Sequence, residues 1–276
     1  MSIWVVIVLA VVQGVAEFLP ISSSGHLAVL GRLFGIEEDA NETLAILLHA
    51  GSLLAILVFY WKTLIGFLSP KQWHLAGMVI LATIPAGVAG VGIKLLDISI
   101  FDNLAATGML FLITATLLRM SEKPGLIVRR RGEENVPPAS LEKITFRQAV
   151  VVGVSQMLAI LPGLSRSGTT ISAGILCGVN REAAGTFSFL LAIPAIGGAA
   201  LLETCKLLSG KVVSKLAVSN MQLVVGFLIS AVVSYGALWL LTGLIRRGRL
   251  AWFSWYLYVL GAAVVGWQLT LALKGR

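Results

Sequence analysis

The feature that most constrains this chain is a series of long stretches without charged side chains. Six of them contain 15 to 25 residues, and about 20 helical residues cross the roughly 30 Å hydrocarbon core of a bilayer. We therefore expect an all-α polytopic membrane protein with six spanning helices, the third short enough to need its polar flanks. The predicted spans are residues 43–61, 75–93, 104–118, 183–202, 221–245 and 250–273.

Composition excludes the other broad classes. Of the 276 residues, 57% are hydrophobic and 12% are charged, which is about half the charged fraction of a soluble protein. Such a hydrophobic chain is not disordered, and two cysteines do not make a disulfide scaffold. The net charge of +8 comes from basic residues in short clusters between apolar stretches. This is the pattern of membrane topology and argues against nucleic-acid binding.

Two further apolar regions are interrupted by polar residues, proline and glycine. Residues 3–35 are broken by Glu17, Pro20 and the polar residues 22–26, and residues 146–178 are broken at 162–168. Non-helical backbone at membrane depth is tolerated only where protein or a water-filled cavity satisfies it. We therefore predict two re-entrant helix hairpins whose polar tips face a cavity.

The two interrupted regions also resemble each other. The offset between matching positions changes only from 139 to 143, and each region precedes three predicted spans. An odd number of crossings per unit makes the second copy inverted. We predict a first repeat at 1–120, a cytoplasmic linker at 121–145 and a second, inverted repeat at 146–276, all in one integral membrane domain. The matching pairs are 14–17 with 153–156, 19–20 with 161–162, 24–25 with 167–168 and 31–35 with 174–178.

The distribution of basic residues predicts the orientation of the chain. With the N-terminus outside, 13 basic residues fall on the inner side and seven on the outer side. The positive-inside rule therefore favours both termini outside. The remaining basic residue is Arg166, which falls in the second predicted tip.

The first tip carries an unusual set of polar residues. Only Glu17 and Glu203 are acidic residues within apolar sequence, and intramembrane ionisable groups are functional candidates by default. Glu17 follows Gln13 by four residues, on one helix face, and precedes three serines and His26. Glu203 is expected to form a local ion pair with Lys206, and His49 is expected to have a structural packing role.

The second tip has the composition of an anion site. Its glycine would let backbone N–H groups approach an anion, its hydroxyls would donate to oxygen, and the following helix would present its N-terminus. A guanidinium adds a two-pronged donor suited to phosphate. A helix cap would explain the hydroxyl groups but not the arginine. The residues concerned are Gly163, Ser165, Arg166, Ser167, Thr169 and Thr170.

Residues 13–26 and 162–170 closely resemble the two signatures of the bacterial undecaprenyl-pyrophosphate phosphatase family of the bacitracin-resistance type. The first signature is Glu or Gln, three residues, then Glu, followed by a serine-rich turn ending in Gly-His. The second is Pro-Gly-x-Ser-Arg-Ser-x-x-Thr. Here Gln13 takes the amide alternative and Ser24 occupies a position where threonine is common. The resemblance covers essentially the whole chain.

The resemblance implies a membrane enzyme that hydrolyses undecaprenyl pyrophosphate to undecaprenyl phosphate and inorganic phosphate. This reaction recycles the lipid carrier for peptidoglycan and other wall polymers and gives bacitracin resistance. The resemblance also implies location in the bacterial inner membrane, an active site open to the periplasmic side, dependence on a divalent cation and a homodimer.

Roles for individual residues follow from the resemblance together with their chemistry. Glu17 is expected to hold Mg²⁺ or Ca²⁺, with Gln13 as a second oxygen ligand, and Arg166 to bind the pyrophosphate. Ser23 is the candidate nucleophile and His26 its base or the leaving-group acid. Attack by His26 itself, or by a water activated by the metal, stays open. The residues expected to contact substrate are Ser22, Ser24, Gly163, Ser165, Ser167, Thr169 and Thr170.

Two other functions are compatible with the sequence. Inverted repeats and broken helices are also features of secondary transporters, so the chain could carry or flip a phosphorylated lipid. A non-catalytic membrane protein that binds lipid headgroups is a weaker alternative. A nucleophile beside an acid-base residue favours hydrolysis, because a carrier needs neither.

Overall fold

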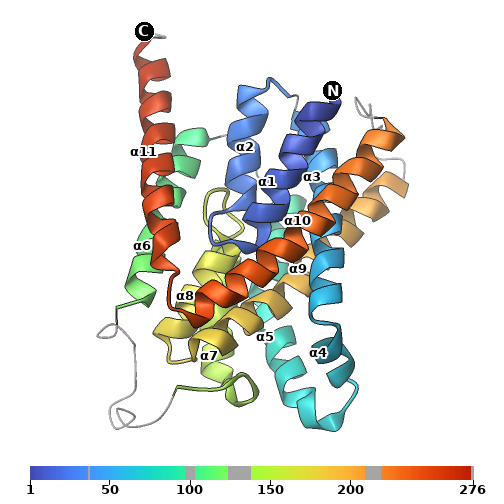
Figure 1. The fold of residues 1–276 in the computed structure, drawn as a ribbon, viewed down its shortest axis with the longest axis vertical. Coiled ribbons are helices and arrows are strands. Elements are labelled where there is room, and N and C mark those ends of the chain that lie inside the picture. The colour runs from blue at the N-terminus through green and yellow to red at the C-terminus, as the bar shows by residue number, and fades with distance from the viewer. Residues whose placement is uncertain (37, 97–102, 124–137, 209–218, 275–276) are drawn as a thin grey trace.

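The computed structural model describes residues 1–36, 38–96, 103–123, 138–208 and 219–274, without the side chains of 38–43, 94 and 202–208. Its long elements are all helices (Figure 1). They are α1 (Ile3–Phe18), α2 (Ser23–Leu33), α3 (Glu38–Phe59), α4 (Trp61–Gly66), α5 (Trp73–Leu95), α6 (Leu104–Ser121), α7 (Phe146–Leu158), α8 (Arg166–Leu176), α9 (Arg181–Leu208), α10 (Asn220–Arg246) and α11 (Ala251–Lys274).

Five of the six predicted spans are confirmed as helices long and apolar enough to cross a membrane, in α5, α6, α9, α10 and α11. The sixth predicted span, at 43–61, corresponds to α3, whose described apolar part is Leu44–Phe59. α3 ends at Phe59, two residues before the predicted end, and the short helix α4 begins after Tyr60. The chain is a multi-pass membrane protein.

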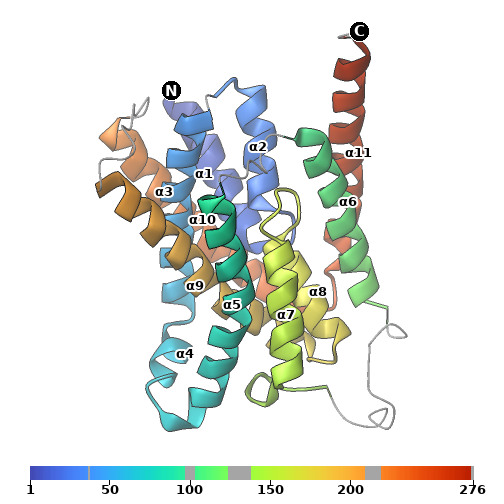
Figure 2. The same ribbon diagram turned by 180° about the vertical axis from the view of Figure 1, so that it is seen from behind.

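The helices pack in a pattern that crosses between the two halves of the chain. α1 packs against α10, α7 packs against α5, and α6 packs along α11. Figures 1 and 2 both show α6 and α11 side by side at one flank of the molecule. There the two backbones approach closely, because a Cβ on Gly261 would lie 2.8 Å from the Gly108 carbonyl oxygen.

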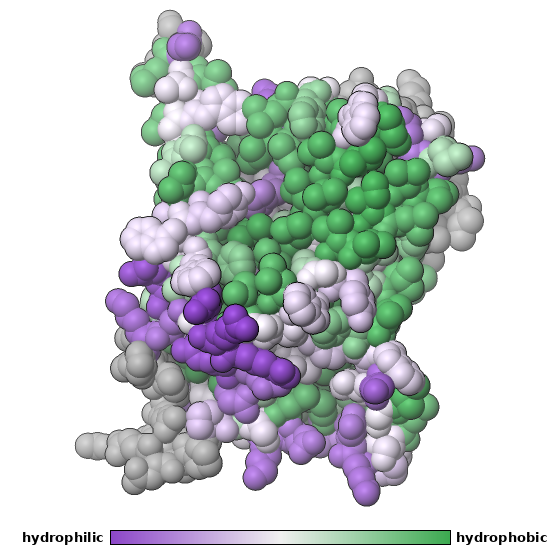
Figure 3. Space-filling view, viewed as in Figure 1, coloured by the Kyte–Doolittle hydropathy of each residue, from purple (hydrophilic) through white to green (hydrophobic). Residues whose placement is uncertain are grey.

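The surface is consistent with insertion in a bilayer. In Figure 3, hydrophobic side chains cover most of the face formed by α10 and its neighbours, and hydrophilic ones gather toward the lower end. Many large apolar side chains are exposed, among them Trp239, Val232 and Val259. An exposed apolar surface of this extent is expected where lipid replaces water.

Local sequence explains the two breaks in the helices. α1 ends at Phe18, and Leu19 is extended with ψ 144°, as expected for a residue before proline. α2 then begins at Ser23, capped by the Ser22 side chain. α7 ends at Leu158, and α8 begins at Arg166 after the Ser165 cap. Each interrupted region is therefore a pair of helices with a polar tip between them.

Two predictions fall outside the described part of the chain. Most of the predicted linker at 121–145 lies in 124–137, which includes its three consecutive arginines. The predicted ion pair between Glu203 and Lys206 concerns side chains that are also not described.

Candidate active site

The two polar tips are in direct contact. Arg166 Nη2 lies 2.5 Å from Glu17 Oε1, although 149 residues separate them, and the side chains are 15% and 6% exposed. Ser167 Oγ donates to the Leu19 carbonyl at 3.1 Å. A Cβ on Gly25 would lie 2.9 Å from Gly163 Cα. The two tips therefore lie against each other and bring together residues from both halves of the chain.

The Glu17 carboxylate is the centre of this site. Its Oε2 atom accepts hydrogen bonds from Ser23 Oγ at 2.7 Å and from Gln13 Nε2 at 2.9 Å. His49 Nε2 lies 3.3 Å from the same oxygen. A buried carboxylate is tolerated when it is paired and hydrogen-bonded, so these partners stabilise its charge together with Arg166.

His49, for which a structural packing role was expected, lies beside Glu17, a contact that the sequence did not predict. His49 lies on α3 with Nδ1 2.6 Å from the Ala45 carbonyl oxygen, so Nδ1–H donates to that oxygen. This hydrogen bond fixes the ring with Nε2 facing Glu17. The one signal in the sequence was a polar ring inside an uncharged span, which does not identify its partner.

His26 is oriented by a residue that the sequence analysis missed. Its Nδ1 lies 2.7 Å from the Ser22 carbonyl oxygen, so Nδ1–H donates. In the neutral ring, Nε2 then accepts from the Tyr256 hydroxyl of α11 at 2.6 Å. The Tyr256 and His26 rings are stacked with centroids 5.7 Å apart, and Phe111 packs edge-on against His26 at 5.3 Å.

The expected direct pairing of Ser23 with His26 is not what the structure has. The Ser23 hydroxyl donates to Glu17, whereas the two His26 nitrogens face Ser22 and Tyr256. The carboxylate, and not the imidazole, is therefore the hydrogen-bond acceptor of the Ser23 hydroxyl.

The predicted substrate-binding residues divide into two groups. One group lines a small cavity of about 40 Å³ beside Glu17, which holds little more than a water molecule. This group comprises Ser22, Ser24 and Ser165, with Ser23 and Arg166. This volume is too small for a phosphate-sized anion.

The other predicted substrate-binding residues do not line this cavity. Thr170 Oγ1 lies 2.5 Å from Ser188 Oγ of α9 and donates to the Arg166 carbonyl. Ser167 binds the Leu19 carbonyl, and Thr169 is buried with no hydrogen-bond partner for its hydroxyl among the described residues. These side chains support α8 and the contact between the tips.

Gly163 shapes the second tip. Its φ of +96° is favourable for glycine, and a Cβ there would lie 2.3 Å from the Thr107 carbonyl oxygen. Thr114 of α6, another residue missed from the sequence, accepts from the Ser165 N–H at 3.1 Å and donates to the Gly163 carbonyl at 3.2 Å. α6 thus holds the tip that presents Arg166.

The prediction of a divalent cation at Glu17 and Gln13 depends on which oxygen atoms are available there. Within the described part of the chain, no group of three or more His, Cys, Asp or Glu side chains is placed to hold a metal ion. Gln13 Oε1, however, is buried without a partner among those residues. One carboxylate and one amide oxygen suit Mg²⁺ or Ca²⁺ when water and substrate phosphates supply the other ligands.

The fold and the site together define a multi-pass helical membrane protein with a buried polar centre built from two helix breaks. A family model described as "Bacitracin resistance protein BacA" matches residues 6–263. The chain belongs to this bacitracin-resistance family, as its two tip motifs indicated.

Full-length relatives agree with this assignment. The undecaprenyl-diphosphatase of Carboxydothermus hydrogenoformans is 36% identical over 259 residues, which cover 94% of this chain and 95% of the relative. That of Halothermothrix orenii is 35% identical over 268 residues, covering 96% and 98%. That of Corynebacterium striatum is 39% identical over 275 residues, covering 95% and 93%.

Proposed function

We propose that this chain is an undecaprenyl-diphosphatase, which hydrolyses undecaprenyl pyrophosphate to undecaprenyl phosphate and inorganic phosphate. The reaction would recycle the lipid carrier for cell-wall synthesis and give bacitracin resistance. The names of the full-length relatives support the substrate. The observation that carries the proposal is the contact of one carboxylate, Glu17, with two groups. It pairs with the Arg166 guanidinium, which is suited to bind phosphate, and accepts a hydrogen bond from Ser23, the candidate nucleophile.

Substrate binding would begin with Arg166. Its Nη2 is held by Glu17, and its Nη1 is buried with no partner among the described residues, so the guanidinium has a donor available for an anion. A pyrophosphate would draw Arg166 away from Glu17 and engage it through two N–H groups. The N-terminus of α8, which begins at Arg166, adds a favourable dipole.

The chemistry would then fall to the first tip. As Ser23 Oγ bonds to the terminal phosphorus, the bond from that phosphorus to the bridging oxygen breaks and undecaprenyl phosphate leaves. The Ser23 proton passes to Glu17, whose Oε2 already accepts it in a hydrogen bond at 2.7 Å. Arg166 stabilises the charge that develops on the phosphoryl oxygens.

A second step would release inorganic phosphate. Water attacks the phosphoserine, its proton is relayed to His26 Nε2, and the Ser23 oxygen recovers a proton from Glu17 as the P–O bond breaks. His26 is suited to this step because Nδ1–H is anchored to the Ser22 carbonyl at 2.7 Å, which directs Nε2 outward. The Tyr256 hydroxyl already donates to Nε2, so it would take the proton of the water as it passes its own proton to Nε2.

Glu17 and Gln13 are the residues that would hold Mg²⁺ or Ca²⁺. Such a cation, when bound, neutralises charge on the pyrophosphate. With one carboxylate, the site should bind the cation weakly, and Gln13→Glu should tighten binding measured by calorimetry on the purified protein. Unchanged cation binding in Gln13→Glu would instead assign Glu17 to acid-base chemistry alone.

The same proposal includes two inverted repeats, with the pairs α1–α2 and α7–α8 as re-entrant hairpins. The packing supports this arrangement, since α1 packs on α10 of the second half while α7 packs on α5 of the first. In the proposed repeats α7 corresponds to α1 and α10 to α5, so the symmetry that relates the repeats turns one of these contacts into the other. We also propose the repeat boundaries 1–120 and 146–276, a bacterial inner-membrane location, a site open to the periplasmic side and a homodimer.

Phosphate release from undecaprenyl pyrophosphate by the purified protein in detergent tests this function. We expect turnover by the wild type and by Ser254→Ala, a control that removes a buried hydroxyl bonded only within α11 at 2.6 Å among the described contacts. Ser23→Ala should abolish it. Absence of phosphate release, with translocation of labelled lipid in vesicles, would support the transporter function instead.

A further inference from the structure

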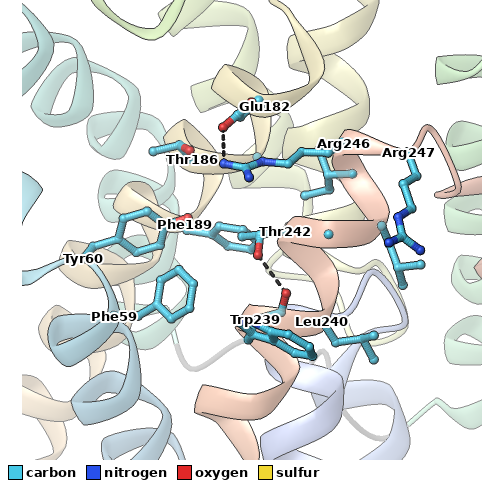
Figure 4. Close-up of a pocket in the computed structure, with 14 residues that line it drawn as sticks. Phe59, Tyr60, Glu182, Thr186, Phe189, Trp239, Leu240, Thr242, Arg246 and Arg247 are labelled. Carbon is cyan, nitrogen blue, oxygen red and sulfur yellow. Dashed lines mark hydrogen bonds and ion pairs between the residues drawn. The ribbon is translucent and has the colours of Figure 1, made fainter.

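A second and much larger cavity lies between α3, α9 and α10, where α10 ends (Figure 4). Its volume is about 520 Å³, within the range of small-molecule sites. None of its lining residues belongs to the cavity around Glu17. The proposed hydrolysis therefore leaves this cavity unexplained.

Aromatic side chains form one wall of the cavity. Tyr60 packs against Phe59 with ring centroids 5.0 Å apart and against Phe189 at 6.1 Å. Trp239 and Leu240, which also line the cavity, are 70% and 48% exposed. This part of the cavity opens onto the apolar surface that faces lipid and suits a hydrocarbon chain.

Charged side chains form the opposite end. Arg246 Nη2 lies 2.5 Å from Glu182 Oε1, with the side chains 66% and 60% exposed. Arg247 follows Arg246 and also lines the cavity, and Figure 4 shows its guanidinium apart from that ion pair. An exposed ion pair contributes little to stability, so an anion can displace Glu182 at little cost. The two arginines and one carboxylate leave this end positively charged.

We propose that this cavity binds an anionic phospholipid, with the headgroup phosphate on Arg246 and Arg247 and an acyl chain along Trp239 and Phe59. Charge complementarity and the amphipathic lining together select this ligand. A free anion would gain nothing from the aromatic wall, and a neutral hydrocarbon would leave the arginines without a new partner. Basic pockets between membrane helices bind anionic headgroups in this way.

A glycine in the wall provides a steric test that spares the charges. Gly243 lines the cavity, and a Cβ added there meets no atom within 4 Å. Gly243→Leu should therefore obstruct part of the cavity without disturbing the backbone. Gly236→Leu is the matched control, because Gly236 is on the same helix, has equally open space around its Cβ and does not line the cavity.

The assay is titration of the full chain in detergent with dioleoylphosphatidylglycerol, followed by native mass spectrometry. We expect Gly243→Leu to weaken the tightest binding event about tenfold and Gly236→Leu to leave it unchanged. The double variant Arg246→Gln, Arg247→Gln should weaken it as well, which keeps the test valid if Gly243→Leu is poorly folded. Thermal unfolding measured on each variant checks folding.

Three results would overturn the proposal. Equal affinity for dioleoylphosphatidylcholine would show that charge does not select the ligand. Displacement of the phosphatidylglycerol by millimolar inorganic phosphate would make the site one for free anions. Wild-type affinity in both the folded Gly243→Leu and the arginine double variant would place the bound lipid elsewhere.

Discussion

Replacing Tyr256 with phenylalanine removes one hydroxyl group and keeps the ring that stacks on His26. Tyr256 Oη lies 2.6 Å from His26 Nε2, and the two rings are nearly parallel at 12°. Because His26 Nδ1–H is already committed to the Ser22 carbonyl, Tyr256 is the donor that holds the reactive nitrogen. The variant should leave the ring packing intact and remove the hydrogen bond that orients the His26 ring.

The expected loss follows from the energy of one hydrogen bond. Such a bond between neutral groups contributes about 0.5–1.5 kcal/mol, and about 1.36 kcal/mol corresponds to a tenfold change in rate. We expect kcat for phosphate release from undecaprenyl pyrophosphate to fall about two- to thirteen-fold. KM should change less than about twofold, because Tyr256 contacts His26 and not the cation that binds phosphate.

Two controls make this prediction specific. Tyr258 is on the same helix, and its hydroxyl lies 3.1 Å from Thr116 Oγ1 rather than in the site, so Tyr258→Phe should retain wild-type kcat. In a His26→Ala background, Tyr256→Phe should cause no further loss. Equal kcat values for the two phenylalanine variants, or a full additional loss without His26, would refute the positioning role.

Three further predictions concern the contact between the tips. Arg166→Lys should lower kcat/KM about ten- to a hundredfold, since a charge-assisted hydrogen bond contributes about 1.5–3 kcal/mol and lysine lacks the planar fork. A wild-type kcat/KM for phosphate release in this variant would contradict the prediction. Cysteines at Ser24 and Ser167 should crosslink with short reagents on a denaturing gel, and failure in a folded variant would argue against adjacent tips. Gly163→Ala should lower Tm, because its Cβ would lie 2.3 Å from the Thr107 oxygen; an unchanged Tm would contradict the close packing.

Local sequence was sufficient to predict the long helices and the breaks at the two tips, but not the short helix α4. Span length and absence of charge located α5, α6, α9, α10 and α11. Pro20 and the polar residues at each tip located the interruptions. The internal similarity indicated that the two tips occupy corresponding places in the chain, and the ion pair between Glu17 and Arg166 shows that they are in contact.

The supporting residues could not be predicted because their partners depend on how helices pack. His49, Tyr256 and Thr114 each come from a different spanning element and reach the tips only in the folded bundle. Nothing in the neighbouring sequence distinguishes Tyr256, which binds His26, from Tyr258, which binds Thr116. Single-sequence periodicity gives the face of a helix but not the residue opposite it.

We propose that one buried carboxylate, Glu17, joins both tips into a single catalytic site. Glu17→Gln tests it most directly, because the change preserves the shape of the side chain and removes its negative charge. The carboxylate pairs with Arg166 at 2.5 Å and accepts a hydrogen bond from Ser23 at 2.7 Å. At saturating undecaprenyl pyrophosphate, we predict that phosphate release by the folded variant falls at least about a hundredfold, or roughly 2.7 kcal/mol. Turnover within about threefold of the wild type would contradict the claim.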